Sequence, residues 1–165
     1  MRARTFEVLS RLQARALRIA EEVLVLLRAG YGDAGSARWR ALHETAVVTC
    51  FIAAHGDDCA QRFMAHEGVE RWKAMQEFQG HAEVLEEERY TPDELAVGEA
   101  EYHALLARYG ETFRFDFGWA QQALAASDPR FERARATFKD IEHAANVGHN
   151  RPSVPRGTNR QCSSG

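Results

Sequence analysis

Cysteine and proline are both scarce in this sequence, with three cysteines and four prolines among 165 residues. Cys50, Cys59 and Cys162 are widely spaced, so they do not resemble the dense disulfide framework of a small secreted protein and are typical of cytosolic thiols. An apolar content of 45% and a net charge of -3 indicate a globular chain rather than a disordered one. The length suits one ordinary domain with a buried core.

A long hydrophobic run is also missing. The longest uncharged stretch begins at Thr45 and falls far short of the roughly 20 residues that span a bilayer. No basic-then-apolar secretory signal opens the chain. We therefore expect a cytoplasmic protein with no membrane partner. A helix through residues 45–54 is apolar or neutral on every side, so it is expected to lie at the centre of the fold.

Lysine is rare beside arginine, with two lysines against nineteen arginines, and charge is unevenly distributed. Residues 57–101 carry thirteen acidic and four basic side chains, whereas residues 1–28 and 147–165 each carry a net charge of +3. A dedicated nucleic-acid binder usually has a basic stripe, so the acidic total argues against that class. A basic patch formed by both ends of the chain stays open as an alternative.

Helical spacing dominates the rest of the chain. Apolar residues recur at intervals of three and four over residues 5–29, which predicts an amphipathic core helix. Further helices are expected over residues 33–55, 57–88 and 91–109, separated by Gly56 and by the Thr91-Pro92-Asp93-Glu94 capping signal. Residues 111–118 alternate like a strand without a partner, so we expect an irregular aromatic segment that plugs the bundle. Helices over residues 119–126 and 130–147 follow.

These elements predict an all-α protein, an antiparallel helical bundle of about five main helices. Residues 1–150 are expected to form a single helical domain. Residues 151–165 contain one aliphatic side chain and cannot bury enough apolar surface to order themselves, so we expect a flexible, disordered C-terminal tail.

Five ionisable residues form the best candidate for a catalytic site. Arg40 and Glu44 are four positions apart with His43 beside them, so all three project from one sector of a helix. If the chain makes a hairpin at residues 56 and 57, position 43 lies opposite Glu70 and position 40 lies opposite Lys73. A histidine flanked by carboxylates suits a general base, and the arginine suits an anion or phosphate. The competing interpretation is a buried network that fixes helix register.

The burial of this cluster is itself a prediction. Because an uncharged run follows them directly, His43 and Glu44 are expected to be largely removed from water and bonded to groups on the next helix.

A second polar group suggests a metal site. Glu77 and His81 on one predicted helix, and Glu99 and His103 on the next, could converge, and these ligand types suit zinc or iron. The spacing within each pair is four, however, whereas di-iron bundles use Glu-x-x-His, and a solvated stripe of salt bridges explains the same residues. We therefore expect no metal and no cofactor.

The end of the last predicted helix lacks a known ribonuclease signature. Small helical ribonucleases of the HEPN type use an arginine followed several residues later by a histidine. Here His149 precedes Arg151, and Arg135 and His143 are too far apart for that signature. The sequence contains no phosphate-binding glycine loop, nucleophile elbow or cysteine pair of metal spacing.

Several segments together form a more specific pattern: Arg38-Trp39-Arg40-Ala41-Leu42-His43-Glu44, Val47-Val48, Phe51-Ile52-Ala53, His55-Gly56, Arg62-Phe63, Glu70-Arg71-Trp72-Lys73-Ala74 and Phe117-Gly118-Trp119-Ala120. This pattern resembles a bacterial family of helical proteins, domain of unknown function 5677, over about residues 15–152. The resemblance implies an uncharacterised all-helical protein and little about activity. Family members typically continue into another helical segment, so the end of this chain is expected to be truncated, frameshifted or a linker scar, and the protein inactive if the active groups lie there.

The leading functional hypothesis is therefore an HEPN-like nucleic-acid-processing protein, an RNase or a defence- or toxin-associated enzyme, with RNA or another nucleic acid as its partner. This hypothesis rests on analogy of fold. The alternatives are a non-catalytic helical module for protein interactions and a metal-binding helical bundle. Loss of a terminal helix is expected to expose apolar surface around Phe131, Phe138 and Ile141 and to drive homodimer formation or aggregation. The alternative is that the five helices already close the core and the tail extends into solvent.

Overall fold

The computed structural model describes residues 3–149, and every regular element in this range is helical. The elements are α1 (Ala3–Arg28), α2 (Gly32–His81), α3 (Pro92–Tyr109), η1 (Glu111–Arg114), η2 (Gly118–Ala120), α4 (Gln121–Ala125), η3 (Pro129–Glu132) and α5 (Phe138–His149), where η marks a 3₁₀ helix. The predicted all-α class with five main helices is confirmed. The predicted tail, residues 151–165, lies outside the described residues.

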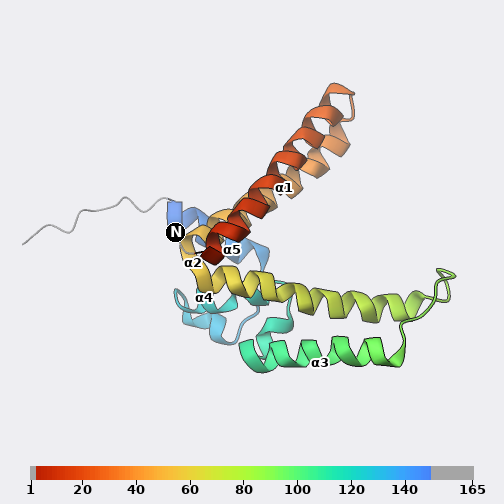
Figure 1. Cartoon of the computed structure of the whole chain (residues 1–165). Helices are drawn as coiled ribbons and strands as arrows, with labels where there is room; N and C mark the ends of the chain where they lie inside the picture. Colours follow the sequence, from red (N-terminus) through yellow and green to blue (C-terminus); the bar gives the residue numbers. More distant parts are fainter. Residues whose placement is uncertain (1–2, 150–165) are drawn as a thin grey trace, which may run out of the picture.

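The longest helix, α2, bends at one residue and gives the molecule its shape. Gly56 has φ 76° and ψ -155°, a conformation that is essentially restricted to glycine. Residues 32–55 run antiparallel beside α1 and form a projecting two-helix arm with it, whereas residues 57–81 lead away from the arm and run antiparallel beside α3 (Figure 1). The predicted hairpin at residues 56 and 57 is therefore wrong, because the two halves of α2 diverge from Gly56 instead of packing side by side (Figure 1).

The bend is held by the start of α1. The backbone nitrogen and the hydroxyl of Thr5 both donate to Oδ1 of Asp57, at 2.9 and 2.7 Å. Thr5 is buried, so these bonds form in a partly dry environment where they are stronger than at the surface. They join the N-terminus of the arm to the first residue beyond the bend.

The second half of α2 packs closely on α3. A Cβ atom at Gly98 would lie 3.0 Å from the Trp72 ring and 3.1 Å from the sulfur of Met75, so the missing side chain lets the helices approach. The predicted capping box at the start of α3 is confirmed, with Thr91 and Glu94 each accepting from the other's backbone nitrogen. The predicted end of the preceding helix near residue 88 is wrong, since α2 ends at His81.

The irregular segment after α3 fills the core, as the sequence predicts. Phe113 is fully buried and Trp119 is 4% exposed. The Trp119 ring meets Phe51 and Phe63 edge-on, at centroid distances of 5.8 and 5.0 Å, an arrangement that aromatic quadrupoles favour. The aromatic residues of this segment thus join the two halves of α2 around one core.

The last predicted helix, residues 130–147, is wrong at its start. Helix α5 begins at Phe138, and the preceding stretch is held by the buried side chain of Gln121. Its Nε2 donates to the carbonyls of Phe131 and Ala134, and its Oε1 accepts from the backbone nitrogen of Ala136 at 3.1 Å. Because a side chain satisfies these backbone groups, the segment does not need helical hydrogen bonds.

The expected exposed apolar surface at the C-terminal end is also wrong. Phe131 and Ile141 are buried and Phe138 is half-buried, because the aromatic segment and α2 cover them. Large exposed apolar side chains occur instead on the arm: Leu17, Leu24, Val25, Leu27, Tyr31 and Trp39. No helix within residues 3–149 has the length and hydropathy needed to cross a membrane.

Candidate functional site, a groove at the elbow

Two adjoining cavities lie in the angle between the arm and the second half of α2. Their volumes are about 510 and 480 Å³, and Leu12, Arg15 and Phe63 line both. We call the two together the elbow groove. Its walls come from α1, from both halves of α2, from the segment around η2 and from the start of α5. A volume of this size accommodates a nucleotide or a short polymer segment.

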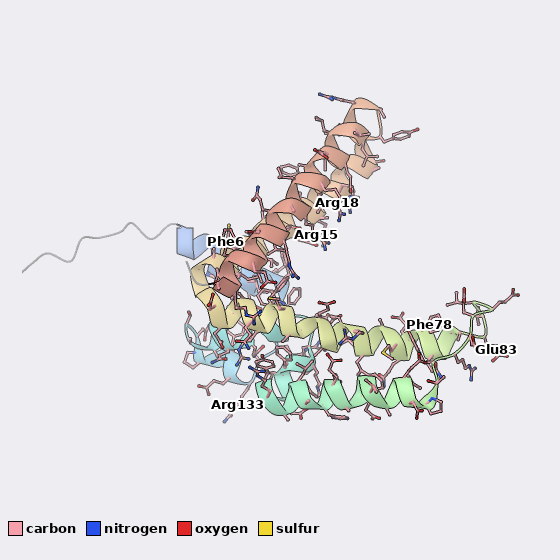
Figure 2. All side chains as sticks on the ribbon, in the orientation of Figure 1. Phe6, Arg15, Arg18, Phe78, Glu83 and Arg133 are labelled. Atoms are coloured by element: carbon pink, nitrogen blue, oxygen red, sulfur yellow. The ribbon has the colours of Figure 1, made fainter. Side chains whose placement is uncertain are left out.

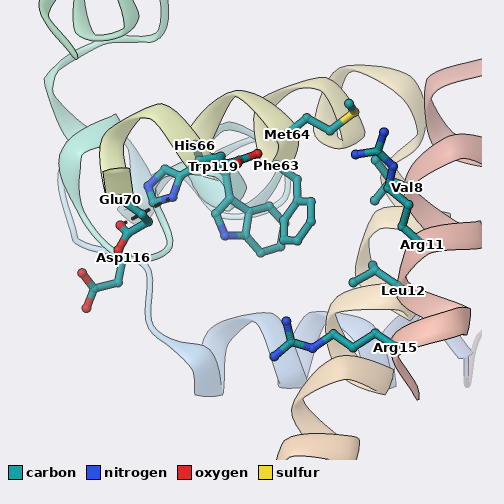
Figure 3. Close-up of a pocket in the computed structure, with 11 residues that line it drawn as sticks. Val8, Arg11, Leu12, Arg15, Phe63, Met64, His66, Glu70, Asp116 and Trp119 are labelled. Atoms are coloured by element: carbon teal, nitrogen blue, oxygen red, sulfur yellow. Dashed lines mark ion pairs between the residues drawn. The ribbon is translucent and has the colours of Figure 1, made fainter. Parts of the chain in front are cut away.

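One wall of the elbow groove is basic. Arg11 and Arg15 project from α1 into the cavity that Trp119 also lines (Figure 3), and Figure 2 places Arg15 on the inner side of the arm. Arg40 of α2 adds a third guanidinium. Arg11 pairs with Glu7 at 2.8 Å, whereas Arg15 has no ion pair within the part of the chain that the structure describes.

The floor of the elbow groove is aromatic. Phe63 and Trp119 line the first cavity, and Phe117 and Phe138 line the second. Phe117 and Phe138 are tilted rings with centroids 6.3 Å apart. Trp119 is only 4% exposed, so the half-buried rings of Phe63, Phe117 and Phe138 form the accessible part of this floor. Apolar rings beside guanidinium groups suit a ligand that combines negative charge with planar rings.

The opposite wall is acidic but partly neutralised. Glu67, Glu70 and Asp116 line it, and Nζ of Lys73 donates to Glu70 at 2.8 Å and to Asp116 at 3.1 Å. Partial burial acts to lower the pKa of Lys73, but its bonds to the two carboxylates outweigh that effect and raise the pKa above its usual value. Lys73 therefore stays charged and offsets part of the acidic wall.

His66 is the residue that sequence reasoning missed. It is not among the candidate site residues that the sequence predicts, yet it is a histidine that is only 5% exposed. Its Nε2 donates to the carbonyl oxygens of Phe113 and Phe115, at 3.0 and 2.9 Å, and Nδ1 lies 3.7 Å from Glu70 (Figure 3). Burial lowers the pKa of His66, and this effect exceeds the opposing ones of the carbonyls and Glu70. His66 is thus a neutral donor behind the acidic wall.

The five predicted catalytic residues do not form one bonded cluster. Arg40 pairs with Glu44 at 3.2 Å on the arm, and Lys73 pairs with Glu70 on the other half of α2. Arg40, Glu44 and Glu70 line different parts of the elbow groove. They therefore face a shared space, although the bend at Gly56 keeps the two pairs apart. Their catalytic role stays a prediction.

His43 has a different partner from the one expected. Its Nε2 bonds to Oε1 of Glu142 on α5 at 2.7 Å, with exposed fractions of 49% and 34% for the two side chains. The predicted burial of His43 and Glu44 against the next helix is therefore wrong, because that helix leads away from the arm. The His43 ring contacts Phe138, which lines the elbow groove. A half-exposed histidine held by a carboxylate is suited to acid–base chemistry.

The order of an arginine followed several residues later by a histidine does occur at His43. Arg38 precedes His43 by five positions, a pattern that the comparison at the C-terminal end does not include. In the structure the guanidinium of Arg38 is held by Glu22 of α1, whereas His43 is held by α5. The two side chains therefore have separate partners.

The residues of the possible metal site stay within their own helices. His103 pairs with Glu99 at 3.8 Å on α3, and Nδ1 of His81 donates to the carbonyl of Glu77 at 2.9 Å. Among the side chains that the structure describes, no group of three or more histidine, cysteine or acidic residues is placed to hold a metal ion. Burial raises the pKa of the Cys59 thiol to about 12, so this cysteine is an unreactive core residue.

Comparison with known proteins identifies a family but no activity. Residues 6–152 match the model of a family described as "Family of unknown function (DUF5677)". No curated protein and no solved structure matches the sequence.

Proposed function

The chain belongs to the DUF5677 family, a family of unknown function, and we propose that the protein binds single-stranded RNA in the elbow groove. The supporting observation is that three arginines and several aromatic rings line the same groove. Guanidinium groups bind phosphates, and aromatic faces stack with unpaired bases. The same pairing recurs in sites for single-stranded nucleic acid.

The charges of the groove suit RNA that lies with its phosphates on the basic wall and its bases toward the acidic wall. Arg15 has no protein partner among the described residues, and the partner of Arg11 is an exposed carboxylate four residues away, a pairing of small energetic value that a phosphate can displace. Glu70 and Asp116 on the opposite wall are oxygen acceptors. They suit the amino groups of bases that stack on the floor between the two walls.

RNA processing of the HEPN kind is the finer part of the proposal. With Nε2 of His43 donating to Glu142, Nδ1 keeps its lone pair and can accept the proton of a 2′-hydroxyl. That oxygen attacks the adjacent phosphorus, and the bond from phosphorus to the 5′-oxygen breaks. The leaving 5′-oxygen takes up a proton from water, and the products carry a 2′,3′-cyclic phosphate and a 5′-hydroxyl. Glu142 holds the imidazole in the required tautomer and stabilises its charged form.

Binding is tested with a fluorescently labelled single-stranded RNA oligonucleotide and fluorescence anisotropy. Arg15→Glu reverses the free charge of the basic wall and is expected to weaken binding at least about tenfold, which corresponds to about 1.4 kcal/mol. Arg133→Glu is the matched control, because Arg133 is exposed and lies outside the groove (Figure 2). Equal affinity of the two variants would overturn the groove as the RNA site.

Cleavage is tested separately. His43→Gln is expected to keep RNA binding and to abolish the formation of cyclic-phosphate products, whereas His103→Gln on the exposed face of α3 leaves both unchanged. Product formation that persists in His43→Gln would show that the activity belongs to another residue or to a contaminant. RNA binding without any cleavage by the wild type would support the binding role and refute the enzymatic one.

A further inference from the structure

The arm carries an exposed apolar stripe that is separate from the elbow groove. Leu17, Leu24 and Leu27 on α1 are 59%, 48% and 54% exposed, and the exposed Ala20 lies between them. Positions 17, 20, 24 and 27 alternate intervals of three and four, which is the spacing of the core positions in a coiled coil. Trp39 on α2 adds a ring that is 61% exposed.

Most of this stripe is separate from the contact that holds the arm together, although the side chain of Leu27 also reaches Gly35 of α2. Ile19 and Val23 are buried and form the contact between α1 and the first half of α2. At about 100° per residue, the stripe around Leu24 lies about 160° from Arg15 around the helix axis. Helix α1 thus has three faces: a buried one, a basic one toward the elbow groove, and an apolar one on the far side.

The spacing and the charges indicate what covers the stripe. Apolar residues with heptad spacing pack against the same kind of stripe on another helix. Residues 151–165 contain a single aliphatic side chain, Val154, so they cannot form such a stripe. Glu21 and Arg28 flank the seam, and neither has an ion-pair partner among the described residues. If two copies of α1 meet antiparallel around a two-fold axis near Leu24, Glu21 of one copy lies within one residue of Arg28 of the other.

We propose that two copies of this chain associate through these stripes, so that their arms form an antiparallel four-helix bundle. Such an interface is isologous, because the same patch is used on both copies. The elbow grooves lie on the other side of each arm and stay open. The proposal does not depend on RNA binding.

The available area is close to what a stable dimer needs. Five large side chains of this face and its end are about half exposed or more: Leu17, Leu24, Leu27, Tyr31 and Trp39. At about 200 Å² for each fully exposed side chain, they offer roughly 500 to 600 Å² per copy. A standard interface buries about 800 Å² per partner, and the flanking small and charged residues supply the remainder.

The test is the mass of the full chain in solution, measured by light scattering after gel filtration. The wild type is expected at twice the chain mass of 18.6 kDa. Leu24→Glu places a charge at the two-fold axis and is expected to give a monomer with an unchanged circular dichroism spectrum. Val25→Glu is the matched control, because Val25 is 64% exposed on another face of the same helix, and it stays dimeric. A monomeric wild type, or an equal effect of both variants, would overturn the proposal.

Charge reversal tests the antiparallel register. Glu21→Arg and Arg28→Glu each place like charges against each other across the interface, and each is expected to weaken the dimer. The double variant exchanges the two signs and restores the wild-type dissociation constant. If the double variant is weaker than either single variant, the antiparallel arrangement around Leu24 is refuted.

Discussion

Replacing His66 with leucine tests the structural role of the buried imidazole. The change removes a hydrogen-bond donor from two carbonyl oxygens. The Phe115 carbonyl keeps a bond from the backbone nitrogen of Gly118 at 2.7 Å, so the Phe113 carbonyl is the group left without a donor. One buried unsatisfied carbonyl costs about 1 to 3 kcal/mol, which is a large part of the stability of a domain of this size.

Urea unfolding followed by circular dichroism measures this loss. With a urea dependence of about 2 kcal/mol per molar, the midpoint of His66→Leu is expected to fall by about 0.5 to 1.5 M. His103→Leu is the control, because His103 is exposed and its pair with Glu99 is a surface contact, so its change is expected to stay within about 0.5 kcal/mol. Equal midpoints for the two variants would refute the structural account of His66.

The pH dependence adds a second readout. Burial lowers the pKa of His66 in the folded protein, so below its ordinary unfolded-state pKa of about 6.5 the unfolded chain binds a proton that the folded chain does not. The stability that neutral His66 provides is therefore complete above that pH and is lost as the pH falls toward the folded-state pKa. The difference in unfolding free energy between wild type and His66→Leu is expected to shrink from pH 8 to pH 5. A constant difference would contradict the burial of a neutral imidazole.

Alanine substitutions at two glycines are expected to change stability in opposite directions. Gly118→Ala is expected to destabilise by at least about 1 to 3 kcal/mol, because a Cβ atom there would lie 2.5 Å from the carbonyl oxygens of Thr112 and Phe113; a thermal melt with an unchanged midpoint would refute this contact. Gly80→Ala is expected to stabilise by up to about 1 kcal/mol, since Gly80 is helical and exposed with open space around its Cβ position; a lowered midpoint would contradict it.

Local chemistry made part of the fold predictable from the sequence. Thr91 and Glu94 cap a helix through atoms three residues apart, and Gly56 interrupts one through its own backbone freedom, so both features are visible in a short window. The direction of the chain after Gly56 is not visible in a short window, because it depends on the bonds between Thr5 and Asp57, which are 52 positions apart. Sequence spacing contains no information on such a contact, and the predicted hairpin was wrong for this reason.

The candidate site was predictable in residue type but not in arrangement. Arg40, Glu44 and Glu70 do face one groove, yet the sequence placed them in contact because it assumed a hairpin. The role of His66 depends on carbonyls in an irregular segment 47 and 49 positions away, which no periodic pattern reveals. The stripe around Leu24 has a heptad spacing in the sequence, but an amphipathic core helix over residues 5–29 predicts only one apolar face.

A small change of angle at Gly56 would displace the far end of the arm by a much larger distance. Residues 32–55 rise about 1.5 Å each, so the tip of the arm lies about 36 Å from Gly56, and one degree of rotation there moves the tip by about 0.6 Å. The bonds from Thr5 to Asp57 lie next to Gly56, where a small shift corresponds to a large sweep at the far end. The two bonds between Thr5 and Asp57 therefore help to set the direction of the arm and, in the proposed dimer, the distance between the two grooves.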